Sequence, residues 1–196
     1  MLLLLAVLAV PALCHTCRHT LGLSDGTIKD SQISASSSFS PRTVGPSKAR
    51  LGTERGGGAW CPASLLTPET GDQEWIQVDL ERDMVVEGVM VQGRYAGGQG
   101  QEFAEFVRIL VWDSKEEDWQ VVRDNTSSLV IRANKDTHSK VQIFFKEPVI
   151  TSMVRIVPVS KHPRMVCLRV ELLGCHIQSQ GNNFGLENYF CVPNIC

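Results

Sequence analysis

The sequence has almost no excess of charge of either sign. Its 19 Lys and Arg residues and 21 Asp and Glu residues give a formal net charge of −2. A protein that binds nucleic acid or an anionic membrane surface through its overall field needs a marked basic excess. We therefore expect no nucleic-acid partner.

The sequence also lacks a long apolar run. Residues 2–13 form a short apolar stretch that ends in small residues just before Cys14. A membrane-spanning helix needs roughly 20 apolar residues, so this stretch is too short. It is typical of a secretory signal peptide, although the basic residues that usually precede one are missing. We predict a signal peptide over residues 1–14, a secreted or extracellular location and no transmembrane segment; a buried N-terminal strand or helix is the alternative.

No set of catalytic or metal-binding side chains stands out. Metal-ligand spacing is absent from the five histidines, which are His15, His19, His138, His162 and His176. The sequence contains no Ser/His/Asp or Cys/His set and no glycine-rich nucleotide loop with its lysine. We expect no enzymatic activity in this chain, no cofactor and no metal ion.

Cysteine, in contrast, is well represented, with seven residues. Cleavage of the signal peptide with Cys14 would leave Cys17, Cys61, Cys167, Cys175, Cys191 and Cys196. Secreted chains retain disulfides, and six cysteines can form three bridges in fifteen pairings. The Cys14–Cys17 CxxC motif overlaps the predicted cleavage site and precedes no βαβ pattern, so it does not indicate a redox site.

Several short segments alternate apolar and polar residues. They are residues 75–80, 107–112, 141–145, 153–157 and 168–172. A period of two with β-branched residues predicts strands, and no segment sustains a helical period over three turns. Strands with one buried and one wet face are usually antiparallel. The sequence predicts an all-β sandwich or jelly roll.

Loops rich in Gly and Ser separate these strands. The main ones are residues 34–41, 56–58 and 96–100. Loops on a rigid sandwich often carry binding residues, although plain connection is the alternative for each. The alternating pattern stops after Cys175, and we interpret residues 176–196 as an irregular tail.

Five motifs, taken in order, resemble a discoidin domain, also called a coagulation factor 5/8 type C domain. They are Ile33–Ser40, Gly58–Pro62, Trp75–Leu80, Gln92–Gly98 and Val166–Cys175. The sequence is most similar to the discoidin domain receptors, which are collagen-binding receptor tyrosine kinases. We assign residues 15–175 to the domain. The resemblance implies an eight-stranded jelly-roll barrel with disulfides and with binding loops at one end.

The resemblance also implies two disulfides, Cys17–Cys175 and Cys61–Cys167. The first would join the two ends of the domain, and the second would lie near the binding loops. Cys191 and Cys196 would then pair with each other or with a partner chain.

In the receptors, loops at the barrel end form a trench for the collagen triple helix. The resemblance implies that Phe39, where the family usually has Trp, is an apolar anchor and that Thr43 is a nearby contact. An exposed aromatic ring gives rigid contact area at low entropic cost. Arg94 and Glu102 match an ion pair at the trench floor, although this pair would alternatively only brace the glycine-rich loop.

Two positions depart from the receptor pattern. Gly57 stands where the receptors have an acidic contact residue, and Met165 stands where a small polar residue is usual. Both departures bear on the choice of ligand. Met165 would still add an apolar contact.

These features together predict an extracellular binding module, as a truncated or soluble receptor form in cell–matrix adhesion or signalling. The expected partner is fibrillar collagen or another extracellular matrix protein, with a homodimer as an alternative to a single chain. The alternative function is binding of phospholipid or glycan at the cell surface. The loop of residues 97–100 has no apolar side chain to insert into a membrane, which disfavours phospholipid binding. The sequon Asn125-Thr126-Ser127 predicts N-glycosylation at Asn125.

Overall fold

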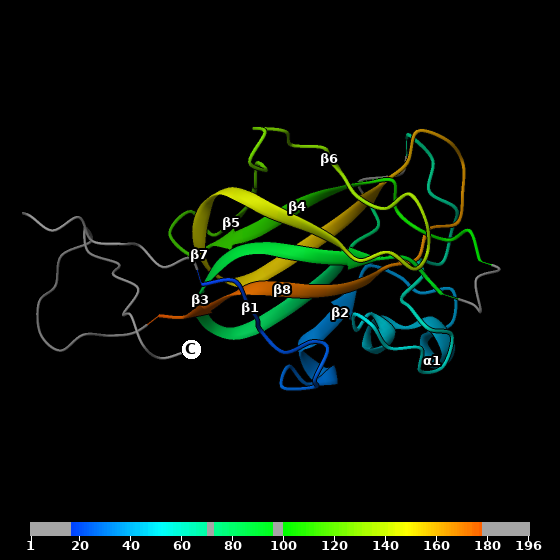
Figure 1. Cartoon of the computed structure of the whole chain (residues 1–196), viewed down its shortest axis with the longest axis horizontal. Helices are drawn as coiled ribbons and strands as arrows, with labels where there is room; N and C mark the ends of the chain where they lie inside the picture. The colour runs from blue at the N-terminus through cyan, green and yellow to red at the C-terminus, as the bar shows by residue number, and fades with distance from the viewer. Residues whose placement is uncertain (1–16, 70–72, 96–99, 178–196) are drawn as a thin grey trace, which may run out of the picture. The chain divides into compact units, whose positions relative to one another are not determined.

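Eight strands form one curved sheet in the computed structural model, which describes residues 17–69, 73–95 and 100–177 (Figure 1). The strands are β1 (His19–Thr20), β2 (Ile33–Ala35), β3 (Ile76–Gln92), β4 (Phe106–Asp113), β5 (Asp118–Val121), β6 (Ile131–Arg132), β7 (Val141–Val159) and β8 (Arg169–His176). One short helix, α1 (Pro41–Val44), and two 3-10 turns, η1 (Asp30–Gln32) and η2 (Pro46–Lys48), precede β3. The predicted all-β class and the eight strands are confirmed.

The two long strands β3 and β7 give the sheet its curvature. The order is β1-β8-β3-β7-β4-β5, with β2 beside β3 and β6 beside β4, and all these pairs are antiparallel. The register of β3 against β7 shifts between Asp79 and Met84 and again between Val86 and Gly88. Such bulges bend a strand and increase its twist. The first part of β3 therefore pairs with β2 and its second part with β8, and the sheet curls into a half-barrel (Figure 1).

The core follows the alternation that the sequence predicts for β3. Ile76 and Val78 are fully buried, and their neighbours on β7, Val154 and Ile156, are also fully buried. Residues 141–145 and 153–157, expected as two strands, are parts of the single strand β7. Their separation in the sequence pattern arises because the register shifts interrupt the alternation.

The face of β8 that the sequence predicts to be exposed to solvent is buried. Arg169 and Glu171 keep only 1% and 0% of their surface exposed. Glu171 accepts hydrogen bonds from the backbone N–H groups of Gly22, Leu23 and Ser24, at 3.2, 3.0 and 2.7 Å. Loops therefore cover the second face of β8, and the two charged side chains hold those loops rather than meet solvent.

The predicted signal peptide, residues 1–14, lies outside the described residues. So does the predicted tail except for its first two residues, and of these His176 ends β8. Within the described part of the chain, no helix is both long and apolar enough to cross a membrane.

Candidate functional site

The five residues that the resemblance assigned to ligand binding line one cavity of about 280 Å³. The cavity is lined by Phe39, Thr43, Val44, Gly57, Cys61, Arg94, Glu102 and Met165. These residues come from four separate stretches of the chain, so only the fold brings them together. Sequence reasoning did not assign Val44 to the lining, because a buried valine in a helical turn carries no motif.

The loop that carries Phe39 is held firmly at its base. The backbone N–H of Phe39 donates to the carbonyl of Cys61 at 3.0 Å, and the indole N–H of Trp60 donates to the carbonyl of Ser37 at 2.8 Å. The hydroxyl of Ser37 donates to a carboxylate oxygen of Glu74 at 2.6 Å. Phe39 itself is 67% exposed. A fixed loop with an exposed ring loses little freedom on binding, which favours a role as an anchor.

The disulfide Cys61–Cys167 forms part of the cavity wall. The two Cα atoms are 4.3 Å apart, and both residues are buried in a small cluster with Val44 and Ala59, against which Met165 packs. This predicted disulfide is confirmed. It ties the loop beneath Phe39 to the segment that carries Met165.

The second predicted disulfide, Cys17–Cys175, stays a prediction. Strand β1 pairs with β8 so that His19 lies opposite Gly174, which brings the two ends of the domain side by side. Cys191 and Cys196 lie outside the described residues.

Arg94 and Glu102 form the predicted ion pair. Nη1 of Arg94 lies 3.7 Å from Oε1 of Glu102, and the backbone N–H of Arg94 donates to the carbonyl of Glu102 at 2.9 Å. The two side chains are 32% and 31% exposed. Nε of Arg94 is buried and has no hydrogen-bond partner within the described residues. Arg94 therefore braces its loop, while its Nε–H group has no hydrogen-bond acceptor within the described residues.

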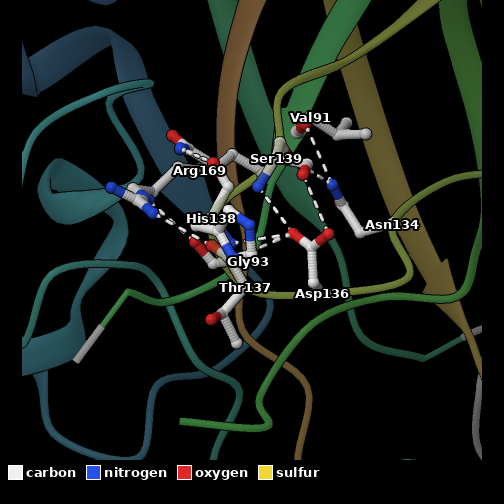
Figure 2. Close-up of polar contacts among 9 residues, drawn as sticks. Val91, Gly93, Asn134, Asp136, Thr137, His138, Ser139 and Arg169 are labelled. Atoms are coloured by element: carbon white, nitrogen blue, oxygen red, sulfur yellow. Dashed lines mark hydrogen bonds and ion pairs between the residues drawn. The ribbon is translucent and has the colours of Figure 1, made fainter. Parts of the chain in front are cut away.

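A buried guanidinium fixes the loops behind this ion pair. Arg169 donates to the backbone carbonyls of Gly93, Thr53 and Thr137, at 2.8, 3.1 and 3.2 Å. Gly93 directly precedes Arg94, and Thr53 begins the loop that leads to Gly57. Burial lowers the pKa of Arg169, and the charge of Glu54 opposes this shift. Figure 2 shows Arg169 with Gly93 and Thr137.

The loop that contains Thr137 has its own bracing. Asp136 accepts from the backbone N–H groups of His138 and Ser139, at 3.0 and 2.6 Å, and from the Ser139 hydroxyl at 2.8 Å (Figure 2). The side-chain amide of Asn134 donates to the carbonyl of Ser139 at 2.9 Å. The polar residues of this loop are thus used in holding its shape.

The geometry at Gly57 explains its departure from the receptor pattern. A Cβ atom there would lie 2.4 Å from Cγ1 of Val44 and 2.8 Å from the carbonyl oxygen of Thr43. The N–H of Gly57 donates to that same carbonyl at 2.6 Å. No acidic side chain fits at this position unless the helical turn beside it moves.

A second hollow of about 850 Å³ adjoins the first. It shares Glu102 and Met165 with the cavity and is also lined by Gly100, Gln101, Phe103, His162 and Arg164. Arg164 lies over the ring of Phe103, with its guanidinium carbon 4.4 Å from the ring centre. It also pairs with Glu105, with 3.1 Å between Nη1 and Oε1. These residues lie in irregular segments without periodicity, so no sequence signal marked them.

Two further expectations concern sites away from the cavity. Within residues 17–69, 73–95 and 100–177, no group of three or more His, Cys, Asp or Glu side chains is arranged to hold a metal ion. Asn125 lies exposed in a turn next to Asp124. Glycosylation of Asn125 stays a prediction.

Comparison with known proteins gives consistent matches. The F5/8 type C domain family matches residues 32–172. The chain is 40% identical over 159 residues to discoidin domain-containing receptor tyrosine kinase B of Caenorhabditis elegans, covering 81% of this chain and 20% of that protein. It is 42% identical over 159 residues to the epithelial discoidin domain-containing receptor 1 of Homo sapiens, covering 81% of this chain and 17% of that receptor. The chain thus spans about a fifth of the length of these relatives.

Among solved structures, discoidin II of Dictyostelium discoideum has a similar fold. The TM-score is 0.62 at 18% identity, with 89% of this chain and 63% of that chain covered. At this identity the likeness concerns the fold alone.

Proposed function

Because this chain belongs to the F5/8 type C (discoidin) family of non-enzymatic binding modules, we propose that it is an extracellular module that binds triple-helical collagen. The observation that supports this proposal most is the convergence of Phe39, Thr43, Arg94, Glu102 and Met165 on one cavity. These five residues were predicted from the resemblance of the sequence to the receptors, independently of their positions in space.

The cavity suits an apolar side chain that projects from a rigid rod. Its lining combines the exposed ring of Phe39 with Val44 and Met165. A triple helix carries Gly at every third position, and its other side chains face outward, where an apolar one can enter such a cavity. The binding energy would then come mainly from desolvation of this one contact.

The polar part of the cavity suits the ligand backbone. The side chain of Arg94 is 32% exposed and lines the cavity, so its outer guanidinium N–H groups would donate to a main-chain carbonyl of the ligand. Glu102 keeps the guanidinium oriented through the 3.7 Å ion pair. In this account Arg94 and Glu102 have both roles that the sequence left open, since they brace the loop and contact the ligand.

The proposed test is a solid-phase assay with native and heat-denatured collagen. We expect saturable binding to the native triple helix and a loss of binding after denaturation, because only the rod presents its side chains in a fixed geometry. Equal binding to both forms, or binding to neither, would overturn the collagen proposal. Binding to phosphatidylserine vesicles or to a glycan array instead would support the alternative function.

The relatives named as receptors suggest a role beyond adhesion. We propose that residues 17–177, supplied as an isolated domain, compete with full-length receptors for collagen or for receptor partners. Co-expression with a full-length receptor tests this role, and collagen-induced phosphorylation should fall. Unchanged phosphorylation would contradict it. Sedimentation analysis of the same protein would check the predicted homodimer.

A further inference from the structure

Three basic residues stand close in the chain to residues of the cavity or its rim, in α1, in η2 and in the loop before Gly57. They are Arg42, Lys48 and Arg55, which we call the basic flank. Arg42 precedes the cavity residue Thr43 in α1, and Arg55 precedes Gly56 and Gly57. Cε of Lys48 lies 3.2 Å from where a Cβ on Gly56 would be, so the lysine stem packs along this loop.

The charges of the basic flank are not used inside the protein. In the part of the chain that the structure describes, Arg42, Lys48 and Arg55 take part in no ion pair. Arg42 and Arg55 are exposed, and Lys48 is half-buried. The flank thus differs from Arg94 and Arg164, whose charges are matched by Glu102 and Glu105.

Among residues 40–58, which carry the flank, the only acidic residue is Glu54. Glu54 is the neighbouring carboxylate in the loop, and its field also acts on buried Arg169, whose pKa it raises against the effect of burial. At position 57 the packing against Val44 and Thr43 leaves no room for an acidic side chain. Residues 40–58 therefore carry an excess of positive charge, although the whole chain has a net charge of −2.

We infer that the basic flank binds an acidic side chain of collagen next to the apolar side chain that enters the cavity. This inference rests on the proposed function and adds a ligand preference to it. Each residue of a triple-helical chain advances by about 3 Å, so an Asp or Glu one triplet from the apolar residue is displaced by about 9 Å along the rod. Exposed opposite charges strengthen binding modestly and speed association in a salt-dependent way.

Three triple-helical peptides test the inference. They share one apolar residue that the chain binds and carry Glu, Gln or Lys at the same flanking position. Affinity should fall in the order Glu, Gln, Lys, with about tenfold between the first and the last at low salt, and the difference should shrink as salt rises.

Charge reversal then assigns the effect to the flank. The double variant Lys48→Glu/Arg55→Glu should invert the order of the three peptides. The matched control, Lys115→Glu/Lys146→Glu, makes the same change in net charge at exposed positions that line neither hollow. The control should leave the order unchanged, and both variants should show the thermal unfolding of the parent.

The outcomes separate this inference from the proposed function. Equal affinity for all three peptides would overturn the acidic preference and leave collagen binding intact. If the control variant inverts the order of the peptides as strongly as the flank variant does, the inference is also overturned, because the net charge of the whole protein would then be the cause. If no peptide binds, the proposed function itself fails.

Discussion

The backbone N–H of Phe39 donates a hydrogen bond of 3.0 Å to the carbonyl of Cys61, so the exposed anchor ring is one contact away from a disulfide. Cys61 is in turn bonded to Cys167, two residues after Met165. The two apolar walls of the cavity are therefore parts of one cross-linked unit. This unit is already rigid before a ligand binds, and its rigidity reduces the entropy lost on binding.

Removal of this cross-link should lower both stability and binding. The disulfide spans a sequence separation of 106, and loss of a bridge over such a loop costs about 3 kcal/mol. The variant Cys61→Ala/Cys167→Ala should unfold about 10 °C below the parent, measured by calorimetry without reductant. It should also bind collagen more weakly at temperatures where it is still folded. Unchanged affinity there would show that the bridge has no part in shaping the cavity.

Arg169→Lys should show how much the buried guanidinium contributes. An ammonium group on a flexible stem cannot reach the carbonyls of Gly93, Thr53 and Thr137 together, so some lose their donor. We expect a loss of about 3 kcal/mol in the free energy of unfolding by urea. The control Arg132→Lys alters an exposed arginine and should change this free energy by less than about 0.5 kcal/mol. Similar effects of the two substitutions would contradict the role of Arg169.

Asp124 should make stability depend on acid pH. Burial raises the pKa of Asp124, but hydrogen bonds from the Thr126 hydroxyl and from the N–H groups of Ser128 and Thr126 outweigh burial and lower it below 3.8. A group whose pKa is depressed in the folded state adds stability above its unfolded pKa and loses it as pH falls through the folded value. Asp124→Asn should therefore cost about 1–2 kcal/mol at pH 7 and progressively less below about pH 4. A cost that stays constant from pH 7 to pH 2 would contradict this explanation.

Strong local patterns made the fold predictable. The sequence predicts that Ile76, Val78 and Leu80 lie on one face of a strand, and all three are in the core of the structure. Successive side chains of a strand point to opposite faces, so an alternating pattern identifies the buried face. The short strands β1, β2, β5 and β6 were not predicted, because two to four residues are too few to show any period. The burial of Arg169 and Glu171 was not predicted, since a charged residue in a strand usually faces water unless loops from elsewhere cover it.

The site was predictable only through the family resemblance. Residues 39, 94 and 165 are far apart in the chain, and nothing in their spacing implies a shared cavity. Phe103 and Arg164 gave no signal, because their stacking is a tertiary contact between irregular loops. The basic flank also depends on the fold, since Lys48 lies against Gly56, eight residues further along the chain, through a tertiary contact.

The affinity of Phe39→Ala for native collagen tests the central claim most directly. Leu65→Ala is the matched control, because Leu65 is 52% exposed yet does not line the cavity. Surface plasmon resonance should show a loss of about 2 kcal/mol, roughly thirtyfold in Kd, for Phe39→Ala and almost none for Leu65→Ala, with thermal unfolding unchanged in both. Equal affinities of the parent and Phe39→Ala would contradict the assignment of this cavity as the collagen-binding site.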